Sequence, residues 1–67
     1  MKITLNNTEQ VIEPDNINIS QLLEIKNFTW KLLVIKVNDR LIKRHEYDTV
    51  HVKEGDNVSV IHLITGG

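Results

Sequence analysis

The sequence has no cysteine, only one proline, three glycines and few aromatic residues. Without cysteine the chain can form neither a disulfide framework nor a thiolate metal site. Aromatic residues make up only 4% of the chain, which leaves no stacking platform for single-stranded nucleic acid. No apolar run approaches the roughly 18 residues of a membrane-spanning helix. We therefore expect a protein that binds neither nucleic acid nor membrane.

A strong excess of one charge is also lacking, since the formal net charge is -1 at pH 7. So small a charge creates no strong field toward nucleic acid or lipid. The length of 67 residues predicts a single domain over residues 1–67. The opening "MKITLNN" alternates in polarity and lacks the continuous apolar stretch of a secretory signal peptide. We expect a cytoplasmic protein that is monomeric on its own.

No group of side chains indicates catalysis. The three histidines, His45, His51 and His62, have a spacing that fits no metal template. The serines and threonines have no evident base partner for nucleophilic chemistry, and the acidic residues are scattered over unrelated predicted elements. The sequence therefore predicts a protein that is not an enzyme and has neither a metal site nor a bound cofactor.

The first part of the chain predicts a β-hairpin. Residues 1–6 alternate between apolar and polar side chains, which is the period of a strand with one buried face. Turn-forming residues follow at 7–10, and residues 10–14 can return as a second strand. Pro14 ends that strand, because proline cannot donate a ladder hydrogen bond.

The period then changes to that of a helix. Residues 18–28 place apolar side chains at positions i, i+3 and i+4, which form one helical face. Asn18 is a good N-cap, and Gln21 stands three residues later, as in a capping box. We expect a helix of two to three turns that Asn27 closes.

The second half predicts more strands. Residues 31–37 form a strand with apolar side chains on both faces, followed by a turn, a short strand at 41–43 and one helical turn at 45–47. Residues 58–64 form the last strand, which is central and parallel to the first. The fold class is α+β, with a mixed sheet of four to five strands packed on one main helix.

The last strand also predicts a partner surface. If Val58 and Val60 face the core, Ile61 and Leu63 are exposed, with Val34 beside them on the neighbouring strand. Clustered exposed apolar residues indicate a partner interface. Two alternatives stay open at this point: a loop covers these side chains, or a bulge reverses the alternation.

The chain ends on Gly66 and Gly67, and we expect residues 65–67 to be a flexible tail. Glycine lacks a Cβ atom and samples positive and negative φ about equally. Such a tail could thread into a narrow site of a partner and present the unhindered carboxyl group of Gly67. The alternative is an ordinary frayed terminus without a function.

The second half carries four features that point to one family: "VNDRLIKR" at 37–44, an aromatic residue at 47, "VKEGDNVSVIHL" at 52–63 and the terminal "GG". With these features the chain resembles the ThiS family of sulfur carrier proteins in thiamine biosynthesis. Three positions depart from the usual pattern: Asp39 replaces a glycine, Lys43 a proline and Tyr47 a tryptophan. The residues that match are Asn38, Arg44, Gly55, Asp56, Val58, Gly66 and Gly67.

The resemblance implies a β-grasp, ubiquitin-like fold and a chemistry at Gly67. A ThiF-like adenylating enzyme would use ATP and magnesium to convert Gly67 to an acyl-adenylate. A sulfur donor such as a cysteine desulfurase would then supply sulfur, leaving a thiocarboxylate on Gly67 that passes its sulfur to thiazole synthase. In this scheme Gly66 threads the tail, and the chain is a carrier rather than a catalyst.

Three other functions compete with this interpretation. The small subunit of molybdopterin synthase has the same fold, tail and thiocarboxylate chemistry, although its tail usually carries prolines that "HLITGG" lacks. A ubiquitin-like modifier would form isopeptide bonds. A β-grasp interaction domain would end on glycines that do no chemistry.

Overall fold

The computed structural model describes residues 1–28 and 32–63. Its main element is a five-stranded mixed sheet in the order β2-β1-β7-β4-β5. Strand β7 is central; it runs parallel to β1 and antiparallel to β4, as the sequence predicted. The strands are β1 (Lys2–Leu5), β2 (Thr8–Val11), β4 (Leu33–Val37), β5 (Arg40–Ile42) and β7 (Asn57–His62).

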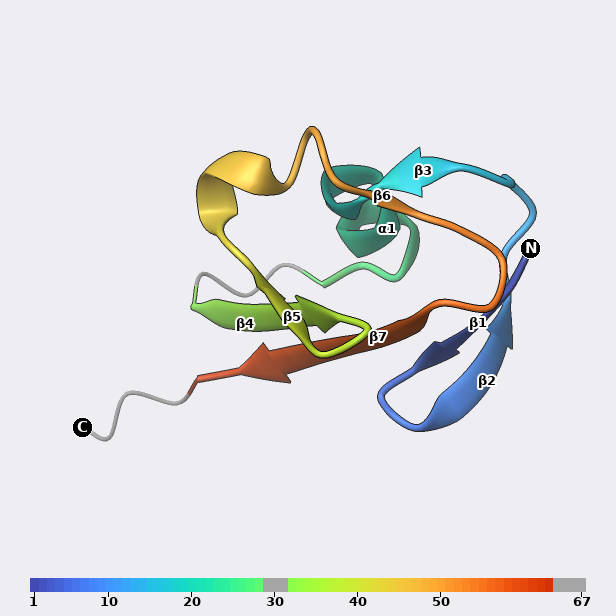
Figure 1. Cartoon of the computed structure of the whole chain (residues 1–67), viewed down its shortest axis with the longest axis horizontal. Helices are drawn as coiled ribbons and strands as arrows, with labels where there is room; N and C mark the ends of the chain where they lie inside the picture. The colour runs from blue at the N-terminus through green and yellow to red at the C-terminus, as the bar shows by residue number, and fades with distance from the viewer. Residues whose placement is uncertain (29–31, 64–67) are drawn as a thin grey trace.

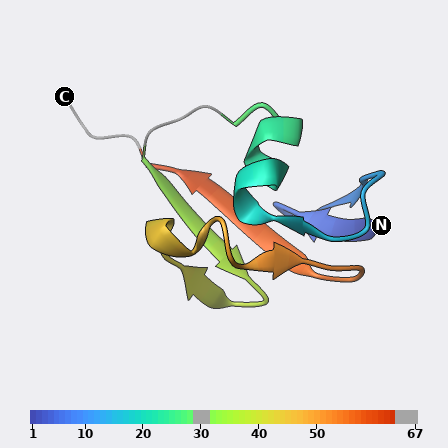
Figure 2. The ribbon, with the colours of Figure 1, turned by 90° about the horizontal axis from the view of Figure 1, so that it is seen from above.

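One face of this sheet is covered and the other is open. Helix α1 (Ile19–Ile25), the short strands β3 (Ile17–Asn18) and β6 (His51–Val52), and the 3-10 turn η1 (Arg44–Glu46) all lie on one side. Figures 1 and 2 show no described element on the opposite side of the sheet. The architecture is thus the two-layer α+β fold that the sequence predicted.

The core fills the space between α1 and the sheet. Strand alternation delivers every second side chain of β1, β4 and β7 to this layer, and α1 meets them with its apolar face. Ile19, Leu22, Ile35 and Val58 are fully buried there. Among the described residues, none of the buried side chains is polar or charged, so the core is held by apolar packing.

The first hairpin turns earlier than the sequence predicted. Asn6 and Asn7 have φ values of 50° and 66°, which is the pattern of a two-residue type I′ turn. The predicted turn at 7–10 and strand at 10–14 were therefore wrong in their bounds, because β2 already begins at Thr8. Asparagine tolerates the left-handed region well, so the tighter turn is available to this sequence.

Both ends of α1 are capped as the sequence predicted. The Asn18 side chain accepts a hydrogen bond from the Gln21 amide at 2.8 Å, and the Gln21 side chain accepts one from the Asn18 amide at 2.9 Å. At the other end Asn27 has a φ of 58°. Amide groups of Asn27 and Phe28 bond back to the carbonyls of Glu24 and Leu23, which is a Schellman motif. The helix is shorter than residues 18–28 because this motif stops it.

Several other bounds differ from the prediction by one to two residues. The short strand β5 is Arg40–Ile42 rather than 41–43, and the helical turn is Arg44–Glu46 rather than 45–47. The two-residue strands β3 and β6, which pair with each other, were missed because so short a strand has no periodicity to read. Within the described part of the chain, no helix is long and apolar enough to cross a membrane.

Candidate functional site

Strand β7 sets the side-chain directions on which the site depends. Val58 and Val60 are buried against the helix layer, whereas Ile61 is 49% exposed on the open face. Pairing with β4 continues in register from Val58 to His62, so no bulge reverses the alternation. The parity that the sequence predicted for this strand is therefore confirmed.

Leu63 follows β7 directly and extends its direction. Its amide donates a hydrogen bond to the Leu32 carbonyl at 2.9 Å, which keeps the chain beside β4 after the strand ends. The Leu63 side chain is 47% exposed. Leu63, the last described residue, is thus apolar and accessible, and it is held at the end of the sheet. The remaining four residues of the chain follow it.

Four apolar side chains on this end of the open face form what we call the apolar patch. Val34 lies directly opposite Ile61 in the β4–β7 register, at a spacing where cross-strand side chains touch. Leu41 on the neighbouring strand β5 is 51% exposed. The sequence analysis had already grouped three of these residues, Val34, Ile61 and Leu63, as a predicted partner surface. The patch consists of Val34, Leu41, Ile61 and Leu63.

Leu41 is the member that the sequence interpretation missed. Leu41 and Ile42 are adjacent on a short strand, so one of them must point away from the core. Ile42 is buried, and Leu41 therefore faces the open side. The signal was present in the sequence as two successive apolar residues on a strand at the edge of the sheet.

A groove of about 500 Å³ adjoins the patch at the end of the sheet. It opens where β5 has ended but β4 continues, because β4 pairs with β5 only as far as Ile35. Arg44 at its rim is one of the residues that match the ThiS pattern. The groove is lined by Leu23, Phe28, Leu32, Leu33, Val34, Leu41, Ile42, Lys43, Arg44, Tyr47 and Leu63.

Two other residues that match the ThiS pattern, Asn38 and Asp56, hold two turns together at the opposite end of β7. The Asn38 side chain accepts a hydrogen bond from the Asn57 amide at 2.9 Å and donates one to Asp56 at 3.1 Å. Asp56 also accepts a hydrogen bond from the Lys53 amide at 2.8 Å. Asn38 and Asp56 thus fix the β4–β5 turn against the turn that leads into β7, and their role here is structural.

Both of these turns need left-handed backbone. Asn38 and Asp39 have φ values of 50° and 69°, and Gly55 has a φ of 84°. Position 39 is where the ThiS pattern usually has glycine, and aspartate is among the few other residues that tolerate this conformation. The departure at Asp39 therefore leaves the turn geometry intact.

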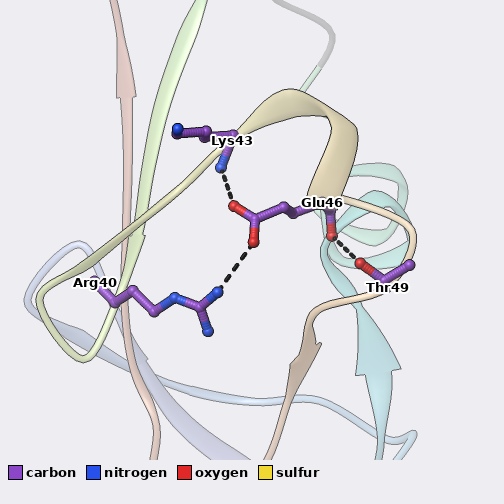
Figure 3. Close-up of polar contacts among 4 residues, drawn as sticks. All are labelled: Arg40, Lys43, Glu46 and Thr49. Carbon is purple, nitrogen blue, oxygen red and sulfur yellow. Dashed lines mark hydrogen bonds and ion pairs between the residues drawn. The ribbon is translucent and has the colours of Figure 1, made fainter.

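Glu46 fastens η1 to the first residue of β5 and to the residue that follows this strand (Figure 3). One carboxylate oxygen accepts a hydrogen bond from the Lys43 amide at 3.0 Å, and the other pairs with the Arg40 guanidinium at 3.0 Å. The Glu46 carbonyl also accepts a hydrogen bond from the Thr49 hydroxyl at 3.2 Å. These contacts set the position of the segment from which Lys43 and Arg44 extend.

The same contacts lower the pKa of Glu46 below its ordinary value. The hydrogen bond from the Lys43 amide contributes most, and the nearby charge of Arg40 adds to it against an opposing desolvation. Both contacts favour the ionised carboxylate. The cap of η1 is therefore a charged group at neutral pH.

No metal centre is visible in residues 1–28 and 32–63. No group of three or more histidine or acidic side chains there could hold a metal ion. Gly66, Gly67 and the predicted tail at 65–67 lie outside the described residues. That Val34, Ile61 and Leu63 form a partner interface stays a prediction. Ile61 and Leu63 are exposed, whereas Val34 is half-buried.

The sequence of the chain places it in a family. The sequence model of the ThiS family matches residues 2–67, which includes both terminal glycines. The chain belongs to the ThiS family. The resemblance stated from residues 37–67 is thereby confirmed, and it extends over the first half of the chain as well. No curated protein matches the chain.

Solved structures agree with this ThiS-family fold. The crystal structure of a thiamine biosynthesis protein (ThiS) from Geobacter metallireducens superposes with a TM-score of 0.90 at 23% identity, covering all of both chains. A solution NMR structure of a thiamine biosynthesis protein from the same organism gives a TM-score of 0.77 at 24% identity, covering this whole chain and 88% of the other. At these identities the likeness concerns the fold, and it confirms the β-grasp.

Proposed function

We propose that this ThiS-family protein is a sulfur carrier for the biosynthesis of the thiazole of thiamine. The observation that carries the proposal is the family match, which runs through the terminal Gly-Gly. The structural relatives named for thiamine biosynthesis support this pathway over molybdopterin synthesis. As a carrier, the chain is a co-substrate of other enzymes rather than a catalyst.

The chemistry takes place at the carboxyl group of Gly67. A terminal carboxylate is ionised at neutral pH and is a poor electrophile. A ThiF-like enzyme, using ATP and magnesium, would join a Gly67 oxygen to the α-phosphorus of ATP and release pyrophosphate. A sulfur nucleophile then attacks the activated carbonyl and AMP leaves. When the sulfur arrives as a cysteine persulfide, a second thiol must cleave the resulting disulfide to leave the thiocarboxylate.

The folded domain contributes position rather than reactivity. The β7 strand carries the chain to the end of the sheet, and the apolar patch lies beside the point where the tail continues. Four residues after Leu63 reach at most roughly 14 Å when extended. A partner that holds the apolar patch can therefore keep Gly67 within a small volume around its reactive site, which is catalysis by proximity.

The proposal is tested by mass spectrometry of the reacted chain. The protein is incubated with a ThiF-like enzyme, ATP, magnesium and sulfide, and it should gain the mass of one oxygen-to-sulfur exchange. Fragmentation should place the sulfur on Gly67, and thiazole synthase with its substrates should remove it again. Omission of ATP is the matched control. Sulfur found on any other residue, or gained without ATP, contradicts the proposal.

The width of the tail gives a second test of the same step. Gly66→Val should react far more slowly, because a β-branched side chain restricts the backbone and widens the segment that threads into the adenylating site. Gly66→Ala is the graded control and should lie between the two. Equal rates for all three chains would show that Gly66 does not thread a narrow site.

A further inference from the structure

The charges of this chain are strongly segregated although the net charge is only -1. Residues 25–45 carry six of the eight lysine and arginine side chains and a single carboxylate, Asp39. The rest of the chain carries two cationic side chains and eight carboxylates. The positive segment includes β4, β5 and the start of η1, which border the apolar patch.

Three of these cations surround the apolar patch. Lys36 lies between Leu41 and Ser59 in the sheet register, so it is on the open face with the patch. Lys36 also lines a small polar hollow of about 230 Å³ together with Ile61. Lys43 and Arg44 line the groove that Leu63 shares.

These three side chains are exposed, and the charge of Lys43 also acts on the nearby Glu46 carboxylate, whose pKa it helps to lower. Among the described residues, Arg40 is the cation of this segment that forms a side-chain ion pair, with Glu46. The structure shows no ion pair for Lys36, Lys43 or Arg44 within residues 1–28 and 32–63. Asp39 lines the same hollow as Lys36 and is the one carboxylate in the positive segment.

A second copy of this chain is a poor partner for such a surface. In a two-fold symmetric dimer the same patch meets itself, so the positive border of one copy would face the positive border of the other. Like charges brought together at an interface oppose association. The surface instead complements an unlike one.

We propose that the apolar patch docks on a protein surface whose apolar socket is bordered by carboxylates. Lys36, Lys43 and Arg44 meet those carboxylates and steer the encounter, while Val34, Leu41, Ile61 and Leu63 fill the socket. The inference rests on the proposed function, since it describes the surface of the enzyme that receives the tail. It assigns a role to the cations that the thiocarboxylate chemistry leaves unused.

The association rate with a ThiF-like enzyme tests this inference. The double variant Lys36→Glu/Arg44→Glu is compared with Lys2→Glu/Lys53→Glu, which changes the net charge equally at the other end of β7. At about 50 mM salt the first variant should associate at least ~10-fold more slowly than the native chain. The second should stay within about 2-fold, and the difference should shrink at about 500 mM salt, where screening is strong.

The association rate tests the acidic socket, and the sulfur gained by the chain tests the carrier function, so the two proposals can fail independently. Equal rates for the two variants, or a native rate that salt does not change, would overturn the acidic socket. Thiocarboxylate formed at saturating enzyme would still uphold the carrier function in that case. A native chain that associates with the predicted salt dependence but gains no sulfur would instead overturn the carrier function alone. No association at all would overturn both.

A membrane is the other surface that exposed lysine, arginine and leucine could meet. Vesicles containing phosphatidylserine provide that probe. The inference requires that they do not retain the native chain under conditions in which the enzyme does. Retention by the vesicles, abolished in Lys36→Glu/Arg44→Glu while the enzyme association rate is unchanged, would assign the surface to lipid instead.

Discussion

At the scale of single residues, left-handed backbone is supplied almost entirely by asparagine and aspartate. The non-glycine residues with positive φ in the described chain are all of these two types, and Gly55 is the one glycine described there. These residues tolerate the left-handed region because their short polar side chains bond locally. The turns that frame the sheet therefore depend on side-chain identity at a few positions: Asn6, Asn7, Asn27, Asn38 and Asp39.

Gly55 gives the first prediction at this scale. A Cβ atom added there meets nothing within 4 Å, yet the φ of 84° is one that side chains rarely adopt. We expect Gly55→Ala to lower the free energy of unfolding by about 1 kcal/mol, purely through backbone strain. Gly55→Asn is the control and should cost less. Urea unfolding measures both, and equal losses would mean that strain is not the cause.

Glu46 gives a prediction about pH. Because its pKa is lowered in the folded protein, its ionised form stabilises the fold at pH values above about 4.5, the unfolded pKa. This contribution is lost as the pH falls through the folded pKa. We therefore expect Glu46→Gln to be less stable than the native protein at neutral pH, with the gap narrowing as the pH falls below about 4.5. Urea unfolding across this pH range checks this; a gap that does not change with pH would contradict it.

At the scale of elements, the two ends of β7 have different tasks. The end at Asn57 is fastened by the hydrogen bonds of Asn38 and Asp56, and the end at His62 leads to the accessible Leu63. The β4 strand is fastened in the same way, since its turn is one partner in that network. A rigid support at one end and an open apolar surface at the other suit a strand that carries a tail to a partner.

The apolar patch can be tested through one of its own residues. Leu63→Asp should weaken binding to the activating enzyme or to thiazole synthase by at least ~1–2 kcal/mol. The isolated domain should stay folded, because the side chain is 47% exposed and surface changes usually cost within about 0.5 kcal/mol. Titration calorimetry and circular dichroism measure the two effects.

The matched control for Leu63→Asp comes from the other face of the same strand. Val60 is 5% exposed, so Val60→Asp should unfold the domain by placing an unpaired charge in the apolar core. If Leu63→Asp unfolds the chain as Val60→Asp does, Leu63 belongs to the core. If it binds as the native chain does, the apolar patch is not the interface.

At the scale of the whole molecule, periodicity was sufficient to predict the two-layer α+β fold, and the family resemblance added the β-grasp. The alternation in residues 1–6 and 58–64 placed the first and last strands, and Asn18 with Gln21 placed the start of α1. The parity of β7 followed from Val58 and Val60. These features depend on short-range patterns, which is why a single sequence contains them.

Other features depend on contacts between distant segments and could not be predicted. Strands β3 and β6 pair Ile17 with Val52, and two residues are too few to show a period. The adjacent Leu41 and Ile42 indicate from the sequence that one of them faces away from the core, but only the β4–β5 register shows that it is Leu41. The proposed role of Gly67 came from the resemblance to a family, since no pattern of side chains in the sequence indicates acyl transfer at a terminus.

The central claim is that the carboxyl group of Gly67 is the site of sulfur transfer, and adding one residue after it tests this most directly. The native chain and the extended chain are each incubated with the ThiF-like enzyme, ATP, magnesium and sulfide, and their masses are compared. The native chain should gain sulfur at Gly67, and the extended chain should stay unchanged while keeping the circular dichroism of the native fold. Equal sulfur gain by the two chains would contradict the account, because the Gly67 carboxyl would then not be the acceptor.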